Sequence, residues 1–148
     1  MKITRKFTTA GSDPFCTVEW TTRSSRISNP DGSVVFEMKD AEVPSTWSQL
    51  ATDIMVSKYF RKAGVPQTEN PFALPGESPV KTDADGKPAT GPERSARQVI
   101  HRLAGCWRHW GETHGYFDTA EDAKAFYDEL VYMMVHQMCA PNSPQWFN

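Results

Sequence analysis

The stretch RISNPDGSVVFEM, residues 26–38, decides the first half of the fold. Its centre, Asn29-Pro30-Asp31-Gly32, has the chemistry of a tight turn, because proline fixes one φ angle and glycine accepts a positive one. The residues around it are typical of pleated, half-buried strands. They include Val18, Trp20, Ile27, Val34 and Phe36. The pattern predicts a β-hairpin within the β-like residues 15–38.

Two helices are predicted next, from apolar residues that recur at helical spacing. The first opens at Pro44-Ser45 with Ser45 as its cap, and Gly64 and Pro66 end it. The second runs from about residue 95 to 113. Gly105 lies inside this helix and weakens it by about 1 kcal/mol relative to alanine. We therefore expect Gly105 to mark a close helix crossing.

A third helix is predicted after the turn HGYFDT. Its start has the pattern of a capping box, formed either by Asp118 with Glu121 or by Thr119 with Asp122. It is expected to end near Cys139, because the proline that follows cannot donate to a helical ladder.

Residues 66–93 differ from the rest of the chain in composition. They hold six of the eleven prolines and few large apolar groups, which favours a flexible Pro/Gly-rich linker. The predicted fold class is α+β: a small N-terminal β-hairpin, then a mostly helical domain of three main helices. The expected division, in chain order, is hairpin plus first helix at 1–65, linker at 66–93, helical hairpin at 94–140 and a final segment at 141–148.

Composition and charge exclude several classes of protein. The 148 residues are 39% hydrophobic and 23% charged, which suits one domain carrying a disordered segment. The net charge is −2; we interpret the basic residues 2–6 as a solvated terminus and those of 94–108 as spread around a helix, so no nucleic-acid partner is expected. No apolar run approaches the ~20 residues of a membrane span, and no signal peptide is evident. Three scattered cysteines favour a reducing cytoplasm.

The cysteines and histidines suggest two alternative chemical sites. Cys106, His109 and His114, with Cys139 downstream, form a candidate zinc set, although no CxxC pair is present. His136 and Cys139 lie three apart on the predicted third helix and form a candidate thiolate pair. A role as small core residues is the simpler interpretation of such cysteines.

Long runs of the chain resemble one enzyme family. HQMCAPNSPQWFN, residues 136–148, resembles the segment that enters the catalytic barrel of adenosylcobalamin-dependent (class II) ribonucleotide reductases. Other runs are similar to the N-terminal region of the same family: NPDGSVVFEMKDAEVPSTWSQLATDI, KYFRKAGVP and RQVIHRLAGCWRHWGETHGYFDTAEDAKAFYDEL. The resemblance implies that the chain leads into the first strand of an α/β barrel that is absent here. It would then be a fragment, one piece of a split reductase, or the part preceding an intein.

The resemblance also implies a chemistry. The family reduces ribonucleoside diphosphates or triphosphates to deoxyribonucleotides through a cysteine thiyl radical, which homolysis of the cobalamin Co–C bond generates. It implies adenosylcobalamin bound by the rest of the enzyme, the remaining reductase polypeptide as partner and a thioredoxin-like reductant; a homodimer is left open. Cys16, Cys106 and Cys139 match none of the family's catalytic cysteines, so the chain alone is expected to be inactive.

The resemblance places one candidate site in this chain. Asn142, Ser143 and Pro144 match the family's substrate-contacting segment, and Ser143 is the residue expected to reach the ribonucleotide. Asn-Ser-Pro is also a good turn, so a structural role is an equal alternative. Two rival functions stay open: a non-catalytic protein-interaction module, and a small metal- or thiol-dependent enzyme.

Overall fold

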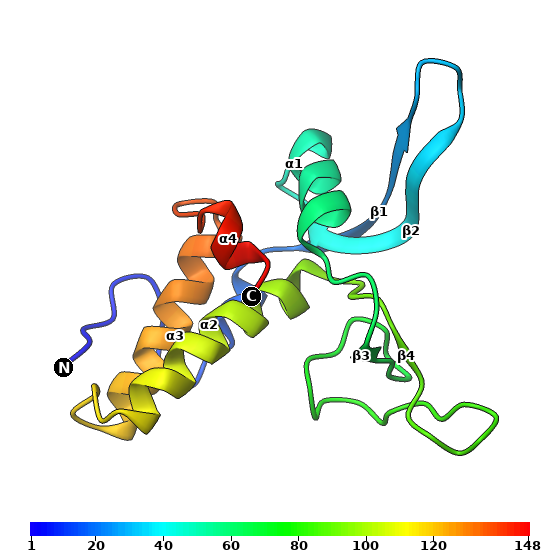
Figure 1. Ribbon diagram of the computed structural model, residues 1–148. Helices are drawn as coiled ribbons and strands as arrows, with labels where there is room; N and C mark the ends of the chain where they lie inside the picture. Colours follow the sequence, from blue (N-terminus) through cyan, green and yellow to red (C-terminus); the bar gives the residue numbers. More distant parts are fainter. The chain divides into compact units, whose positions relative to one another are not determined.

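A computed structural model describes all residues, 1–148, and the chain forms two compact units (Figure 1). Unit 1 comprises Met1–Glu19, Ile100–Trp146 and Asn148, and unit 2 comprises Trp20–Val99 and Phe147. Small antiparallel sheets and helices together make the α+β class that the sequence predicts. No helix combines the length and the apolar character needed to cross a bilayer.

The predicted hairpin is confirmed in unit 2. Strands β1 (Trp20–Ser28) and β2 (Val34–Pro44) pair antiparallel. Gly32 has φ 88° in the turn, and the Asp31 carboxylate accepts hydrogen bonds from the amide and the hydroxyl of Ser33. The β-like reading of residues 15–17 is wrong, because Pro14–Thr17 forms the 3-10 helix η1. The Asp13 side chain caps η1 by accepting from the Phe15 amide.

The first helix begins later than the sequence suggests. Helix α1 (Gln49–Ile54) continues into a π-helical turn, η2 (Met55–Tyr59). Ser48 caps α1, because its side chain accepts from the Ala51 amide at 3.0 Å; the prediction of Ser45 as the cap is wrong. The core of unit 2 gathers where these turns meet the base of the hairpin. Its buried apolar residues include Ala41, Val43, Trp47, Met55, Val56 and Phe60.

The segment 66–93 folds back on itself through short pairings. Strands β3 (Val65–Pro66) and β4 (Thr90–Gly91) pair antiparallel, and further bridges join Thr68 to Val80 and Thr82 to Pro88. Ala73 and Leu74 are buried. The segment thus has hydrogen-bonded structure and a small apolar anchor, and its flexibility stays a prediction.

Two long helices form most of unit 1, as the sequence predicts. Helix α2 spans Ala96–Thr113 and α3 spans Ala120–Val135. Of the two predicted capping boxes, the one formed by Thr119 and Asp122 is present. Helix α3 ends before Cys139, because His136 is already its C-cap and Gln137 turns away with φ 57°.

Glycine marks a close approach in unit 1, but at a different position from the predicted one. A Cβ added at Gly105 would meet only the ring of His101 on its own helix, at 3.6 Å. A Cβ added at Gly111 would lie 2.4 Å from the ring of Phe117. The packing therefore requires glycine at 111, and Gly105 marks no helix crossing.

The last residues are helical. Ser143–Trp146 forms one short helix, α4. Trp146 is buried and Phe147 is exposed. No strand forms within residues 141–148, so the barrel strand implied by the resemblance and the division at residue 141 stay predictions.

Candidate functional site

The candidate substrate segment, Asn142 to Pro144, lies on the surface at the start of α4. All three residues are exposed. The Asn142 backbone carbonyl accepts from the amides of Gln145 at 2.9 Å and Trp146 at 3.4 Å, and its side-chain oxygen accepts from the Ser143 amide at 2.9 Å. Asn142 therefore initiates the helical turn, which is the structural role that the sequence left as an alternative for this motif.

Arg102, on α2, anchors the residues that follow this segment. Arg102 Nη1 donates to the backbone carbonyl of Trp146 at 3.1 Å and to that of Asn148 at 2.7 Å. A charged donor on two carbonyls fixes the backbone more firmly than a neutral bond would. Together with the burial of Trp146, this contact presents Asn142, Ser143 and Pro144 on an anchored turn. Sequence reasoning missed Arg102, because it appears only as one of several basic residues around a helix.

The candidate zinc set does not come together. No group of three or more His, Cys, Asp or Glu side chains is placed to hold a metal ion. Cys106 and Cys139 are free, exposed cysteines, and the His114 ring lies against Tyr116, with the centroids 5.9 Å apart. The geometry therefore offers no support for a zinc enzyme built on this set.

The candidate pair of His136 and Cys139 has the wrong geometry for an activated thiolate. The His136 ring stacks on Tyr132 with centroids 4.0 Å apart, and its Nε2 lies 2.9 Å from the hydroxyl of Thr17. Cys139 lies beyond the end of α3, and desolvation raises the pKa of its thiol. A nucleophilic cysteine needs a lowered pKa, so the shift runs against this chemistry.

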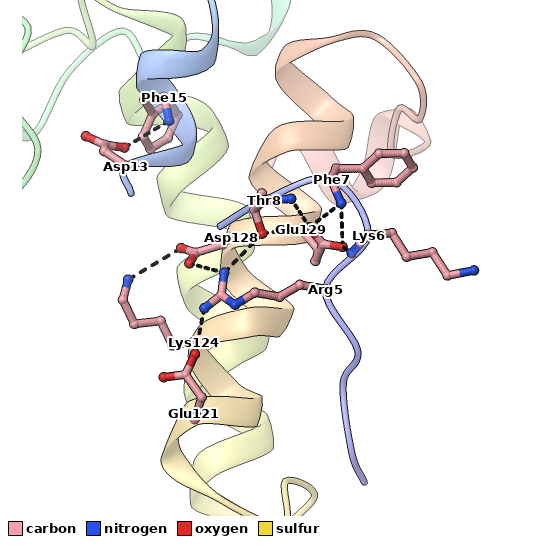
Figure 2. Close-up of polar contacts among 10 residues, drawn as sticks. All are labelled: Arg5, Lys6, Phe7, Thr8, Asp13, Phe15, Glu121, Lys124, Asp128 and Glu129. Atoms are coloured by element: carbon pink, nitrogen blue, oxygen red, sulfur yellow. Dashed lines mark hydrogen bonds and ion pairs between the residues drawn. The ribbon is translucent and has the colours of Figure 1, made fainter. Parts of the chain in front are cut away.

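The most developed polar cluster in the structure is the N-terminal clasp, in which residues 1–8 run along the carboxylates of α3 (Figure 2). Arg5 donates to the Asp128 carboxylate at 2.7 Å and to the Glu121 carboxylate at 2.8 Å. Asp128 is fully buried, and Lys124 approaches its other oxygen at 3.5 Å. Arg5 itself is only 15% exposed, so the interpretation of residues 2–6 as a solvated terminus is wrong at this position.

Glu129 supplies the second half of the clasp. Its carboxylate accepts from the amides of Lys6, Phe7 and Thr8 and from the Thr8 hydroxyl at 2.7 Å, as Figure 2 shows. Desolvation raises the pKa of Glu129, but these bonds to its charged form outweigh desolvation and hold the pKa below its usual value. The Phe7 ring stacks on Tyr132 beside it, at 5.1 Å. The clasp satisfies its own charges, which suits a structural role.

Comparison with known proteins identifies the region. Residues 21–137 match the family described as class II vitamin B12-dependent ribonucleotide reductase. The chain belongs to this family. Helices α2 and α3 and all of the hairpin except Trp20 fall inside the matched region, so these elements belong to the family's N-terminal domain.

Individual reductases extend the match over the whole chain. The vitamin B12-dependent ribonucleotide reductase of Bradyrhizobium diazoefficiens is 48% identical over 100% of this chain and 13% of its own length. The enzymes of Rhodopirellula baltica and Streptomyces coelicolor are 41% and 36% identical, over 93% and 100% of this chain and 11% and 13% of their own lengths. The chain thus spans about one eighth of the reductases it matches.

Proposed function

We propose that this chain is the N-terminal part of a cobalamin-dependent ribonucleotide reductase, and that it works only with the remaining polypeptide. The supporting observation is the alignment of the entire chain with 13% of a vitamin B12-dependent reductase. In the proposed reaction a cysteine thiyl radical abstracts the ribose 3′ hydrogen and the 2′ hydroxyl is protonated and leaves as water. A cysteine pair supplies two electrons and two protons as it becomes a disulfide, and return of the 3′ hydrogen from the first cysteine regenerates its thiyl radical. A thioredoxin-like dithiol then restores the cysteine pair.

The cofactor and the catalytic cysteines belong, in this proposal, to the rest of the enzyme. This chain offers no gathered set of three or more metal-ligating side chains. Its three cysteines are exposed and form no disulfide. Reduced thiols agree with our proposal of a cytoplasmic enzyme. Replacing Cys106 or Cys139 by alanine is expected to leave the turnover of the assembled enzyme within about twofold.

We place the substrate contact of this chain at Ser143. The Ser143 amide is engaged by the Asn142 side chain, so the proposal concerns the serine side chain, on an exposed and anchored turn. A small hydroxyl suits a ribose oxygen or a phosphate. Asn142 and Pro144 contribute by shaping the turn.

The test is reconstitution of activity from two parts. The purified chain is mixed with the separately expressed remainder of a matching reductase, and adenosylcobalamin-dependent reduction of a ribonucleotide is followed in the presence of a dithiol. Restored turnover supports the proposal, and Ser143→Ala should then lower turnover about tenfold or more, the scale of one lost hydrogen bond to a substrate.

The exposed Ser12 of the same unit provides the matched control, because Ser12→Ala removes a hydroxyl outside the tail. Equal losses in both variants would remove Ser143 from the proposal. Association without turnover would reduce the chain's role to structure. Failure to associate at all would favour the interaction-module alternative instead.

A further inference from the structure

Arg102, on α2, bonds to the turn that carries Ser143, and both residues belong to unit 1. We propose that Arg102 is a positioning residue for the substrate contact at Ser143. In this role it fixes the backbone of α4, so that the Ser143 hydroxyl is held where it meets the ribonucleotide. The inference rests on the proposed function above. It adds a residue of α2 to a site that the resemblance placed in the tail alone.

The bonds within the tail leave the end of α4 to Arg102. The carbonyls of Pro144 and Gln145 accept from the side chain and the amide of Asn148, both at 3.2 Å. The Trp146 carbonyl accepts from outside the tail, from Arg102 Nη1 at 3.1 Å. Carbonyls at the end of a helix have no partner within it, and a basic side chain is a common donor to them. Arg102 therefore caps the end of α4.

Arg102 projects from a well-packed part of α2. It lies inside this 18-residue helix and is itself half-buried. Its neighbours Ile100, Leu103 and Ala104 are buried in the core. A group held from a packed helix is placed more precisely than one held from a loop. The guanidinium therefore offers its donors to the tail from a fixed position.

A displacement at Trp146 reaches Ser143 directly. The two residues lie three apart on one helical turn, which is a rise of about 4.5 Å. The φ angle of Pro144, between them, is fixed by its ring, so the segment has few ways to absorb a shift. The Trp146 side chain is buried, which holds the same residue at its other end. Misplacing a substrate contact by about 1 Å can lower a rate by about a hundredfold, so this placement matters for turnover.

Arg108 on the same helix shows what an ordinary surface arginine does. It pairs with Glu112 at 3.1 Å, an i,i+4 pair with both side chains partly exposed. Arg102 instead donates to backbone oxygens 44 and 46 residues away in the chain. Its guanidinium stays charged at any physiological pH, so these bonds do not depend on titration. Arg108 therefore provides the matched control.

The test is a double-variant cycle in the reconstitution mixture described above. Arg102→Gln keeps a good helix former and removes the charged donor. It is combined with Ser143→Ala, and kcat and KM for the ribonucleotide are measured for each single variant and for the pair. Residues that act as one unit give losses that do not multiply, whereas independent residues give losses that do.

Arg102→Gln is expected to lower kcat/KM about fivefold to tenfold, divided between kcat and KM as in Ser143→Ala. The pair should be at most about twofold worse than Ser143→Ala alone, because the positioning has no object once the hydroxyl is gone. Arg102→Lys keeps a charged donor and should stay within about threefold of the wild type. Arg108→Gln should stay within about twofold.

Three results would overturn the role of Arg102 and leave the proposed function intact. The first is an effect of Arg102→Gln no larger than that of Arg108→Gln. The second is multiplied losses in the pair, about fiftyfold or more, which would mean that Arg102 acts elsewhere. The third is wild-type kinetics in Ser143→Ala, which would remove the contact that Arg102 positions. No turnover from the wild-type mixture would overturn both proposals.

Circular dichroism of each variant chain separates positioning from folding. If Arg102→Gln does not fold, Arg102→Met takes its place in the cycle, since methionine is an equally good helix former with an unbranched stem. Loss of the fold in both variants would assign Arg102 to the stability of unit 1 and would overturn the proposal. In a folded variant, the Gln145 and Trp146 amides should exchange hydrogen at least about fivefold faster than in Arg108→Gln. Equal exchange would mean that the turn is held without Arg102, which would also overturn it.

Discussion

The N-terminal segment and the hairpin differ in how far their side chains are satisfied by contacts within their own unit. The N-terminal segment satisfies its polar groups on the carboxylates of α3 and is complete within unit 1. The hairpin in unit 2 is held at its base by Ser25 and leaves Ile27 exposed. The difference indicates that the N-terminal segment is internal architecture, whereas the hairpin keeps apolar surface exposed.

The largest effect should come from the buried charge of the clasp. Asp128→Asn leaves Arg5 with Glu121, which is exposed, as its one charged partner, and is expected to lower the free energy of unfolding by about 2–3 kcal/mol. Glu121→Gln removes the other carboxylate from the same arginine and should cost less than about 0.5 kcal/mol, because Glu121 is 65% exposed. Urea unfolding measures both. Equal, small losses would contradict the description of the clasp as internal architecture.

The next effect concerns packing in unit 1. Gly111→Ala is expected to lower the free energy of unfolding by about 1–2 kcal/mol, because the added methyl group must displace the Phe117 ring. Gly105→Ala adds the same methyl group at an ordinary contact distance and should stabilise α2 by up to about 1 kcal/mol. Thermal unfolding of the two variants should therefore shift in opposite directions. A shift of the same sign in both would mean that unit 1 is packed more loosely than described.

A smaller effect is the pH dependence of the clasp. The pKa of Glu129 is below its usual value in the folded chain, so the stabilisation is present above the unfolded pKa and is lost as pH falls through the folded one. Glu129→Gln should cost about 1 kcal/mol at pH 7 and much less at pH 3, since glutamine keeps one acceptor oxygen. Urea unfolding across this range measures the difference. A pH-independent loss would show that the Glu129 charge does not hold the segment.

In unit 2, the pKa of the Glu42 carboxyl group is shifted upward, opposite to the shift of Glu129. Desolvation raises the pKa of Glu42, against the lowering effects of the Ser95 hydroxyl bond at 2.6 Å and of Arg97. Its ionisation therefore opposes folding, and stability should rise as pH falls from neutrality through the folded pKa of Glu42. Glu42→Gln should abolish this rise in unit 2, as hydrogen exchange of the β2 amides would show.

Local chemistry explains what could be predicted from the sequence. The Asn29–Gly32 turn and the Thr119–Asp122 capping box are encoded within four residues, and both are confirmed. The clasp joins Arg5 to Asp128 across a separation of 123 residues, which no periodicity reveals. Asp128 and Glu129 also occupy buried positions that a polar sequence pattern assigns to solvent. The Arg102 contact with the tail escaped prediction for the same reason.

The predicted start of the first helix was wrong because two serines close together could each cap it. Ser45 and Ser48 both precede α1, and Ser48 prevails because Trp47 is buried ahead of the helix, with its amide bonded to the Pro44 carbonyl. At the other end of the chain, one helical turn initiated by Asn142 buries Trp146. The turn-forming character of Asn-Ser-Pro was evident in the sequence, whereas the burial of this tryptophan depends on contacts that the sequence pattern does not reveal.

The smallest expected effect separates the two regions most clearly. Leu50→Gln should change the free energy of unfolding of the isolated chain by less than about 0.5 kcal/mol, because a 69% exposed side chain contributes little to folding. Val43→Ala in the same unit removes a fully buried side chain and should cost about 1.5–3 kcal/mol. A large loss for Leu50→Gln would mean that this side of α1 belongs to the chain's own core. A negligible loss, beside the larger one for Val43→Ala, would confirm that the core of unit 2 lies at the base of the hairpin and not on the outer side of α1.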